Sequence, residues 1–453
     1  MPCPRNVELI DLGAQPWIAK AAQRGLRVDL DHFAKMDVSL TQGMEQLVED
    51  VHDITGYYIN PGSGDQVADL LFKKLRLKQA KQKLTTSGER ESVEDAVLVA
   101  IQHNHPVIPK LLDYKELEKL RGTYVRPMPK LARRVAFNVY RMFPNFRDTR
   151  VPSGRLSCAD PNLLAMPTRT ERGRDVRRGF ITEKGWKYVS VDESQIEVRI
   201  AAHRSKDPNL IKVYLNEEDI YSDFATAAFK LPDKRYKSDS GEWKYPTVDK
   251  AEHRRPSKTC VLASIYDVTA QGLQEQMPIV CANCKKEASK HDCKRFAPLW
   301  IETKCQDLIN AFYIKYNGLL RMRKADHAFM RRNGYMCDMW GRMLHSTAVR
   351  SVLEWVVSGA LREGSNLPMQ GGAQGTIKLV MAMTDDDYNN YPGIEDICHP
   401  LLQVHDELVY EVREDFAEEW AYHVKWRFEN SFHFDVPIKA SSAMADTWGD
   451  LEK

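Results

Sequence analysis

The sequence predicts an α+β protein with roughly two to four domains, since its 453 residues exceed the size of one ordinary domain. Apolar residues recur at three-to-four spacing in segments 29–54 and 93–124, which indicates amphipathic helices. Segments 186–192 and 401–412 are instead rich in β-forming residues, which indicates strands. Helices therefore make up much of the chain, and a small number of strands lies in its second half.

The remaining segments follow in order. Residues 1–145 are predicted to be mostly helical, interrupted by a polar section at 60–91 with Gly62, Gly64 and Gly88 as helix breakers. Four prolines between 127 and 152 mark a change of organisation. The strand at 186–192 leads at once into a helix, residues 230–255 are predicted to be a loop or insertion, and helices resume near Pro256 and dominate to residue 385. Residues 401–412 are predicted to be a hairpin around His405-Asp406-Glu407.

Composition favours a folded protein, because 43% of the residues are hydrophobic and 28% are charged. The net charge is only +2, so any nucleic-acid binder must concentrate its positive charge locally. Two basic clusters meet this condition: Lys73, Lys74, Arg76, Lys78, Lys81 and Lys83, and then Arg169, Arg172, Arg174, Arg177 and Arg178. On charge alone, a solvated face explains each cluster equally well.

The sequence also predicts the cellular compartment of the protein. No apolar run approaches the roughly 18 residues of a transmembrane helix, and the N-terminus lacks the apolar core of a signal peptide. Nine cysteines, odd in number and unevenly spaced, do not form a disulfide framework. We therefore expect a protein of the reducing cytoplasm with no membrane partner.

Two aspartates are the first candidate functional residues. Asp192 ends the predicted strand, Asp406 lies at the tip of the predicted hairpin, and apolar residues flank both. A carboxylate at the end of a buried strand needs a partner, either an arginine or a divalent metal. Two aspartates can hold two Mg²⁺ ions about 3.5–4 Å apart, an arrangement used in phosphoryl transfer.

A basic and aromatic stripe is the second candidate. Arg254, Lys258, Leu262 and Tyr266 are spaced by four, which places them along one face of a helix. Pro256 fits only the first turn of a helix, so the helix should begin near Arg254. Cations at a helix N-terminus favour phosphate, whereas the alternative is an ordinary amphipathic helix with a solvated basic start.

A third candidate is a zinc knuckle. Cys281, Cys284, His291 and Cys293 form the pattern Cys-x2-Cys-x6-His-x-Cys, which fits a tetrahedral Zn²⁺ site, with Cys305 as a substitute ligand. Unpaired surface cysteines on a lysine-rich loop explain the pattern equally well. If zinc binds, we expect it to order the loop and to take no part in chemistry.

Several motifs occur in a fixed order along the chain. They are Ser153-Gly154-Arg155-Leu156-Ser157, Pro161-Asn162-Leu163, the segment from Asp192 to Arg199, the set Arg254, Lys258 and Tyr266, and Val404-His405-Asp406-Glu407. This ordered set resembles the motifs of family-A DNA polymerases, the group of bacterial DNA polymerase I and several phage replicases. Further segments extend the resemblance over nearly the whole chain: 60–72, 105–124, Gly334-Tyr335, Gly341-Arg342, and Arg362, Asn366, Gln370 and Gly371.

The resemblance implies a right-hand polymerase fold, in which the palm is an antiparallel sheet and the fingers and thumb are helical. The implied domains are a thumb with the N-terminal palm edge at 1–150, a first part of the palm at 151–240, fingers with the candidate zinc knuckle at 241–345, and a second part of the palm at 346–453.

The resemblance also implies roles for particular residues. Asp192 and Asp406 are expected to hold two Mg²⁺ ions, Glu407 to support the site, and Lys258 to contact the triphosphate and donate a proton to pyrophosphate. The expected nucleotide-binding residues are Arg254, Lys258, Leu262, Tyr266, Glu197, Gln195 and Tyr221. Within this set, Glu197, held by Tyr266, is the expected gate against a 2′-hydroxyl. The expected DNA-binding residues are Arg155, Arg169, Asn162, Arg362, Asn366, Gln370 and His405.

Five positions depart from the family pattern. Leu262 stands where Phe or Tyr is usual, which weakens stacking on the incoming base and is known in some phage members. Glu193 replaces an aromatic residue beside the first aspartate, and an added carboxylate there bears on metal preference. Leu164-Ala165 replaces a Gln-Asn pair and Tyr221 replaces a histidine. None of these changes removes an expected metal ligand.

The implied function is template-directed extension of a primer 3′-end with dNTPs. No acidic exonuclease constellation precedes the expected thumb, so we expect no proofreading in this polypeptide, and replication of a phage genome in a host cytoplasm is favoured over bacterial repair. The expected partners are primer-template DNA, dNTPs and separate replication proteins such as a helicase, a single-strand binding protein and an exonuclease. Three alternatives remain: a single-subunit RNA polymerase, against which Glu197 argues; a non-catalytic nucleic-acid-binding protein; and a metal-dependent phosphodiesterase.

Overall fold

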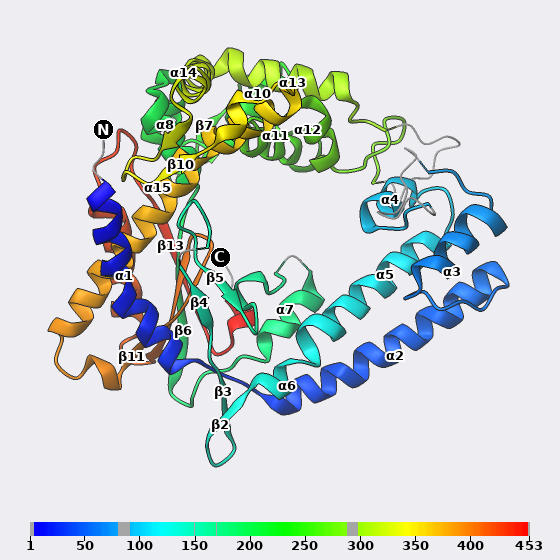
Figure 1. Cartoon of the computed structure of the whole chain (residues 1–453), viewed down its shortest axis with the longest axis horizontal. Coiled ribbons are helices and arrows are strands. Elements are labelled where there is room, and N and C mark those ends of the chain that lie inside the picture. The colour runs from blue at the N-terminus through cyan, green and yellow to red at the C-terminus, as the bar shows by residue number, and fades with distance from the viewer. Residues whose placement is uncertain (1–3, 80–90, 149, 169, 288–297, 452–453) are drawn as a thin grey trace.

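The computed structural model describes residues 4–79, 91–148, 150–168, 170–287 and 298–451. A central sheet carries two helical arms, and Figure 1 shows one arm leaving near each end of the sheet, with both arms extending to the right in this view. We call residues 30–131 the N-terminal arm and residues 196–333 the central arm. In the part of the chain that the structure describes, no helix combines the length and the apolar composition needed to cross a membrane.

The central sheet is four-stranded and antiparallel, in the order β11-β12-β6-β13. Its strands are β6 (Trp186–Glu193), β11 (Cys398–Val404), β12 (Glu407–Arg413) and β13 (Ala440–Ala445). The strand predicted at 186–192 and the hairpin predicted at 401–412 are both confirmed. β11 and β12 form that hairpin, and β12 pairs with β6, an element more than 200 positions earlier in the chain.

Both faces of the sheet are buried. Alternate side chains such as Val189, Val191 and Leu408 pack against α1 (Pro4–Arg24), α15 (Glu354–Asn390) and α16 (Ala417–Asn430). The intervening residues Tyr188 and Val409 pack on the opposite face with α7 (Glu171–Arg178) and the start of α2. Burial on both faces explains why these strands show nearly continuous apolar runs.

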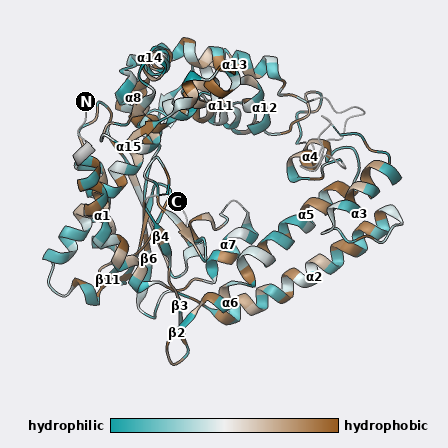
Figure 2. Ribbon diagram, in the orientation of Figure 1, coloured by the Kyte–Doolittle hydropathy of each residue, from teal (hydrophilic) through white to brown (hydrophobic). Residues whose placement is uncertain are grey.

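The N-terminal arm is built on two long helices that lie side by side, α2 (Leu30–Thr55) and α5 (Val107–Lys119). The Asp29 carboxylate caps α2 by accepting from the His32 amide at 3.0 Å, and the helix ends at Gly56, whose φ of 74° is left-handed. This confirms the helix predicted at 29–54. Figure 2 shows hydrophobic residues in patches along α2 and α5 and along the strands of the central sheet.

The tip of the N-terminal arm has a small core of its own. It contains α3 (Gly64–Ala68), a π-helical turn (Asp69–Lys74) and α4 (Asp95–Ile101). The arm returns to the sheet through a second π-helical turn (Leu120–Val125) and α6 (Met128–Leu131). Gly64 was expected to break a helix, but it lies in the first turn of α3, because Ser63 caps that helix. The lysines at 81 and 83 lie outside the described residues.

The central arm packs around one core. Its helices are α8 (Ile196–Ser205), α9 (Pro208–Leu215), α10 (Ile220–Ala228), α11 (Arg255–Ile265), α12 (Ala270–Gln276), α13 (Glu302–Lys315) and α14 (Asn317–Asn333). α8, α9 and α10 contribute to this core, although their residues lie before the domain boundary predicted at 241.

Short strands connect the larger parts. β1 (Leu26–Arg27), β3 (Val139–Met142) and β2 (Arg133–Ala136) form one small sheet, and β4 (Asn145–Arg147) pairs with β5 (Ser157–Ala159). Hairpins join β7 (Tyr236–Lys237) to β8 (Trp243–Lys244) and β9 (Tyr335–Cys337) to β10 (Met343–His345). The expectation that residues 1–145 are mostly helical is therefore wrong for 133–145, where β2 and β3 complete a sheet with β1.

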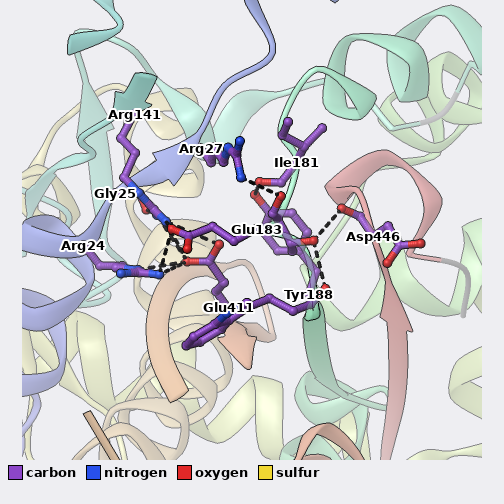
Figure 3. A network of polar contacts seen from close by, with 11 residues as sticks. Arg24, Gly25, Arg27, Arg141, Ile181, Glu183, Tyr188, Glu411 and Asp446 are labelled. Carbon is purple, nitrogen blue, oxygen red and sulfur yellow. Dashed lines mark hydrogen bonds and ion pairs between the residues drawn. The ribbon is translucent and has the colours of Figure 1, made fainter. Parts of the chain in front are cut away.

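A buried ion-pair network joins three of these parts (Figure 3). Glu411 on β12 is 1% exposed and accepts from Arg24 of α1 at 2.9 Å and from Arg141 of β3 at 3.2 Å. Arg141 also donates to Glu183 at 2.6 Å. Burial and the cations Arg24 and Arg141 lower the pKa of the neighbouring His399 to about 4. The network ties α1 and the small sheet to the middle of the central sheet.

Replacing Glu411 with Gln is expected to remove the buried carboxylate of the network and to leave Arg24 and Arg141 with Glu183 as their remaining anionic partner. The free energy of unfolding should fall by about 3–5 kcal/mol, the cost of breaking a buried ion pair on one side. Asp446→Asn, which removes an exposed ion pair with Lys187, is the control and should cost less than about 1 kcal/mol. Urea unfolding followed by tryptophan fluorescence measures both; equal losses for the two variants would contradict the role given to the network.

Candidate active site

The pairing of β6 with β12 brings the two predicted aspartates together. Asp192 is directly opposite Glu407 in the strand register, and Asp406 precedes Glu407 in the hairpin turn. The Glu193 amide donates to the Asp406 carbonyl at 3.0 Å. His405, at the same turn, has a φ of 55°, which brings the chain round sharply between β11 and β12.

Both aspartates open into one pocket of about 500 Å³. Its lining comes from β6, from the β11–β12 hairpin, from the region of α7 and from the C-terminal segment. The described lining residues are Met166, Thr168, Arg174, Arg177, Asp192, Glu193, Val404, His405, Asp406, Glu407, Trp448, Gly449 and Leu451. Four carboxyl groups from adjacent strand ends thus share one polar hollow.

Glu193 is buried in surroundings that are unfavourable to its charged form. Its side chain is 3% exposed, and neither carboxylate oxygen has a hydrogen-bond partner among the described residues. Burial, followed by repulsion from Asp406 and Asp192, raises the pKa of Glu193 well above its usual value. The site therefore gathers four carboxyl groups at close range, and oxygen donors of this kind suit Mg²⁺.

Two neighbours support the pocket wall. Glu407 is buried and accepts a short hydrogen bond from the Ser190 hydroxyl. Arg177 lies with its guanidinium 4.2 Å from the Trp448 ring and donates to the Met166 carbonyl at 2.8 Å. Burial lowers the pKa of Arg177 to about 10, while Glu407 acts in the opposite direction.

The predicted helix stripe is present and begins where expected. α11 starts at Arg255 with Pro256 in its first turn, so Arg254 and Lys258 lie at the helix N-terminus. Arg254 donates to Asp219 at 2.7 Å and lies 5.2 Å from the Tyr221 ring, and the Lys258 ammonium lies 5.6 Å from the same ring. Tyr221 thus carries two cations on one aromatic surface.

Further along the stripe, Leu262 packs against the core of the central arm. Tyr266 ends α11 and hydrogen-bonds to Glu197 on α8. Burial, then Glu197 and Asp406, raise the pKa of Tyr266. Glu197 lies in the first turn of α8, which follows β6 almost directly, so this contact brings the Tyr266 end of the stripe close to the end of β6 that carries Asp192.

Glu197 lies at the centre of a three-residue contact. Arg155 donates to its carboxylate at 2.6 Å, and Tyr266 hydrogen-bonds to the same group. Nearby, Gln195 adopts a left-handed conformation at the start of α8 and accepts from the Tyr214 hydroxyl at 2.9 Å. The structure therefore brings predicted nucleotide residues from two helices to one place.

The other predicted DNA-binding residues are more dispersed. Arg362, Asn366 and Gln370 are spaced by four on α15, and the Asn366 side-chain oxygen is buried without a hydrogen-bond partner among the described residues. Asn162 and His405 are exposed, His405 at the pocket itself. Arg169 lies outside the described residues.

Two of the four predicted zinc ligands lie in the part of the chain that the structure describes. Cys281 and Cys284 lie on a tight turn in which the Lys285 amide donates to the Cys281 carbonyl at 2.9 Å. His291 and Cys293 lie outside the described residues, and Cys305 is buried in the core of the central arm. Within the described ranges, no cluster of three His, Cys, Asp or Glu side chains is arranged to hold a metal ion.

Two contacts at the site were not predicted from the sequence. Asp219 pairs with Arg254, and Trp448 stacks on Arg177, although each pair is distant in the sequence. Asp219 gave only the signal of a helix cap, which it provides for α10. A tryptophan near the end of the chain gave no signal of a role at the pocket.

Comparison with known proteins gives a consistent result. The family described as DNA polymerase family A matches residues 30–450. The thermostable DNA polymerase I of Thermus caldophilus is 31% identical over 434 residues, which cover 95% of this chain and 46% of the relative. DNA polymerase I of Deinococcus radiodurans is 30% identical over 430 residues, covering 95% and 40%. The chain thus spans less than half the length of these curated relatives.

A solved structure extends the comparison to the fold. The POL domain of Pol1 from M. smegmatis, in complex with DNA primer-template and dNTP, superposes with a TM-score of 0.79 at 26% identity. The match covers 97% of this chain and 70% of that one. The right-hand polymerase fold predicted from the sequence is therefore confirmed.

The raised pKa of Glu193 predicts how the free energy of unfolding varies with pH. Its pKa in the folded protein is raised above 4.5, so the folded state keeps a proton that the unfolded chain releases. Above pH 4.5 the wild type should therefore lose about 1.4 kcal/mol of stability per pH unit relative to Glu193→Gln, until the folded pKa is reached.

Urea unfolding between pH 5 and pH 8, roughly the range of ordinary buffers, tests this in the presence of a chelator. Glu414→Gln, which replaces an exposed glutamate at the far end of the same sheet, is the control for the general effect of removing one carboxyl group. Parallel pH profiles for the wild type and Glu193→Gln would contradict the prediction.

Proposed function

Because the chain belongs to DNA polymerase family A, we propose that it extends the 3′-end of a DNA primer with deoxynucleotides selected by a template strand. The observation that carries this proposal is the shared pocket of Asp192 and Asp406 beside the Tyr266 end of α11. The pocket carboxylates, together with the cations Arg254 and Lys258 at the start of α11, supply the groups that phosphoryl transfer from a triphosphate requires.

Asp192 and Asp406 are the residues that would hold the catalytic ions, and the buried oxygens of Glu193 support the fit of a divalent cation. Two Mg²⁺ ions, when bound, increase the acidity of the primer 3′-hydroxyl and neutralise charge on the triphosphate and the departing pyrophosphate. Glu407, fixed by Ser190, holds the hairpin strand in place beside them.

Arg254 and Lys258 bind the triphosphate in this proposal. Asp219 holds Arg254 over Tyr221, so the guanidinium is already oriented before a nucleotide arrives. Lys258, at the α11 N-terminus, donates a proton to the pyrophosphate as it leaves. Leu262 contacts the base with less stacking than an aromatic residue would give.

Glu197 acts as the gate against ribonucleotides. Its carboxylate is held by Tyr266 and Arg155, so it has little freedom to move away from a 2′-hydroxyl. The same restraint argues against the alternative of an RNA polymerase. Gln195 and Tyr221 complete the nucleotide site.

The remaining predicted residues contact DNA. Asn162, Arg362, Asn366, Gln370 and His405 are assigned to the primer-template, together with Arg155 and Arg169. Most of these contacts position the duplex without reading its sequence. The N-terminal arm corresponds to the thumb, the central arm to the fingers and the sheet with α1, α15 and α16 to the palm.

The biological role of this activity is proposed from a single residue. Leu262 supports replication of a phage genome in the host cytoplasm, and bacterial repair is the alternative. Absence of 3′–5′ exonuclease activity stays a prediction, which a primer with a mismatched 3′-end tests directly. Contacts with a helicase, a single-strand binding protein or a separate exonuclease stay predictions too.

Zinc binding also stays a prediction. The turn that carries Cys281 and Cys284 is compact, and Lys285 at its end has a φ of 60°. Such a turn presents two thiolates together, as structural zinc sites require. The metal content of the purified protein, measured by mass spectrometry, decides the matter: less than one zinc per chain would argue against the site.

Replacing Asp192 or Asp406 with Ala is expected to abolish primer extension with Mg²⁺ while DNA binding is retained, because the variants lose ligands and keep the fold. Asp446→Ala, an aspartate just beyond β13 and outside the pocket, is the matched control and should extend primers normally. Gel-based extension on a defined template and fluorescence anisotropy measure the two properties. Extension by either pocket variant at near-normal rate would overturn the proposal.

Glu197→Ala is expected to raise ribonucleotide incorporation relative to deoxynucleotide incorporation by roughly tenfold or more, the scale on which single contacts discriminate between substrates. Glu217→Ala, on the exposed surface of the central arm, is the control and should leave the ratio unchanged. Single-nucleotide insertion with dNTP and rNTP measures kcat/KM for both. An unchanged ratio in Glu197→Ala would remove the residue from the gate.

A further inference from the structure

Arg342, from the Gly341-Arg342 motif, lies apart from the lining of the carboxylate pocket, in an ion-pair cluster between α1 and α15. These two helices lie side by side (Figure 1). The Asp11 carboxylate on α1 accepts from both terminal nitrogens of Arg342, at 2.9 Å and 3.2 Å. The same carboxylate accepts from Lys378 on α15 at 2.7 Å. The guanidinium is thus fixed by a bidentate ion pair, and only 14% of the Arg342 side chain is exposed.

The partners of this ion pair are themselves firmly held. The Lys378 side chain is fully buried in the contact between the two helices. Burial alone would raise the pKa of Asp11, but the hydrogen bonds from Arg342 and Lys378 outweigh it and lower that pKa below its usual value. Asp11 therefore stays ionised at neutral pH, and both cations keep their anionic partner.

The main chain at Arg342 is fixed as well. One carboxylate oxygen of the buried Asp338 accepts from three amides, each at 2.9 Å, those of Trp340, Gly341 and Arg342. The Trp340 ring nitrogen in turn donates to the Gly372 carbonyl of α15 at 2.8 Å. Both the main chain and the guanidinium of Arg342 therefore have defined positions.

The guanidinium of Arg342 lies directly against Gly154. A Cβ atom at residue 154 would overlap the guanidinium carbon and would lie 2.6 Å from Nη2 and 2.7 Å from Nε. Gly154 also has a φ of 76°, a left-handed conformation that favours glycine, and its amide donates to the Val151 carbonyl at 2.8 Å. This turn therefore suits a residue without a side chain, and Arg342 covers it.

Gly154 is followed by Arg155, which holds Glu197. Arg155 donates to the Glu197 carboxylate at 2.6 Å, but the Arg155 side chain is 36% exposed and packs on only part of its surface. Its reach to Glu197 therefore depends on where its main chain lies. On the other side of Arg155, Leu156 is buried in the core that packs against the central sheet. The main chain of Arg155 is thus fixed from both sides, by the guanidinium over Gly154 and by Leu156.

We propose that Arg342 is a positioning residue for the gate that excludes ribonucleotides. The inference rests on the proposed function, since it concerns the contact of Arg155 with Glu197. Asp11 fixes the guanidinium, the guanidinium fixes the turn at Gly154, and that turn determines where Arg155 meets Glu197. A group that discriminates between substrates must be held closely in place, so residues that hold it contribute to selectivity although they touch no substrate.

Arg342→Lys tests the proposal. This variant keeps a cation for Asp11 and should fold, but it lacks the planar group that covers Gly154. The ratio of kcat/KM for a ribonucleotide to kcat/KM for the matching deoxynucleotide should rise by about threefold to tenfold, less than in Glu197→Ala. Asp11→Asn, which leaves Arg342 without this anionic partner, should shift the ratio in the same direction.

Asp385→Asn is the matched control. It breaks the 2.5 Å ion pair of Asp385 with Lys20, which joins the same two helices away from Arg342, and should leave the ratio unchanged. If Arg342 acts through Glu197, Arg342→Lys should not raise the ratio further in a Glu197→Ala background. A rise of the same size in both backgrounds would overturn the proposal, as would unchanged ratios in Arg342→Lys and Asp11→Asn.

Hydrogen exchange followed by mass spectrometry tests the positioning without any nucleotide. Amides of segment 151–157 should exchange faster in Arg342→Lys and Asp11→Asn than in the wild type, and at the wild-type rate in Asp385→Asn. Unchanged exchange in the first two variants would overturn the positioning role, even in a chain that extends primers. Faster exchange in a chain that extends no primer would support the hold on this turn and refute the proposed function alone.

Discussion

The register between β6 and β12 is the constraint on which the site depends. Asp192 faces Glu407 across the strand pair, so Asp406, one residue earlier, lies at the mouth of the same pocket. A slip of one residue would send every side chain of β12 to the opposite face and separate the aspartates. The ion pairs of Glu411 with Arg24 and Arg141 hold the same strand further along, which opposes such a slip.

Burial of the strands and the charge at their ends conflict at this site. Its strands are buried on both faces, which gives rigidity, yet their ends carry several carboxyl groups at close range. Burial, followed by repulsion from Asp406 and Asp192, raises the pKa of Glu193. Gathering carboxyl groups at the buried strand ends thus has a local cost in stability, which is common at functional sites.

Local patterns in the sequence were sufficient for the main features of the fold. Periodicity located α2, β6 and the β11–β12 hairpin, and Pro256 located the start of α11. Ordered motifs then predicted which of these elements would meet. Contacts between distant side chains carried no such signal: Asp219 resembled an ordinary cap, and β2 and β3 resembled helical surroundings because their pairing with β1 is not local.

The position of β13 and Trp448 has a consequence for the integrity of the sheet and of the pocket. β13 forms the edge of the central sheet beside β6, and Trp448 covers Arg177 at the pocket. Both lie far from these partners in the sequence, so neither the sheet edge nor this wall of the pocket is formed by local contacts. Loss of the residues around β13 and Trp448 should therefore leave an unpaired edge on β6 and an uncovered guanidinium at the pocket, even where the helical arms keep their own cores.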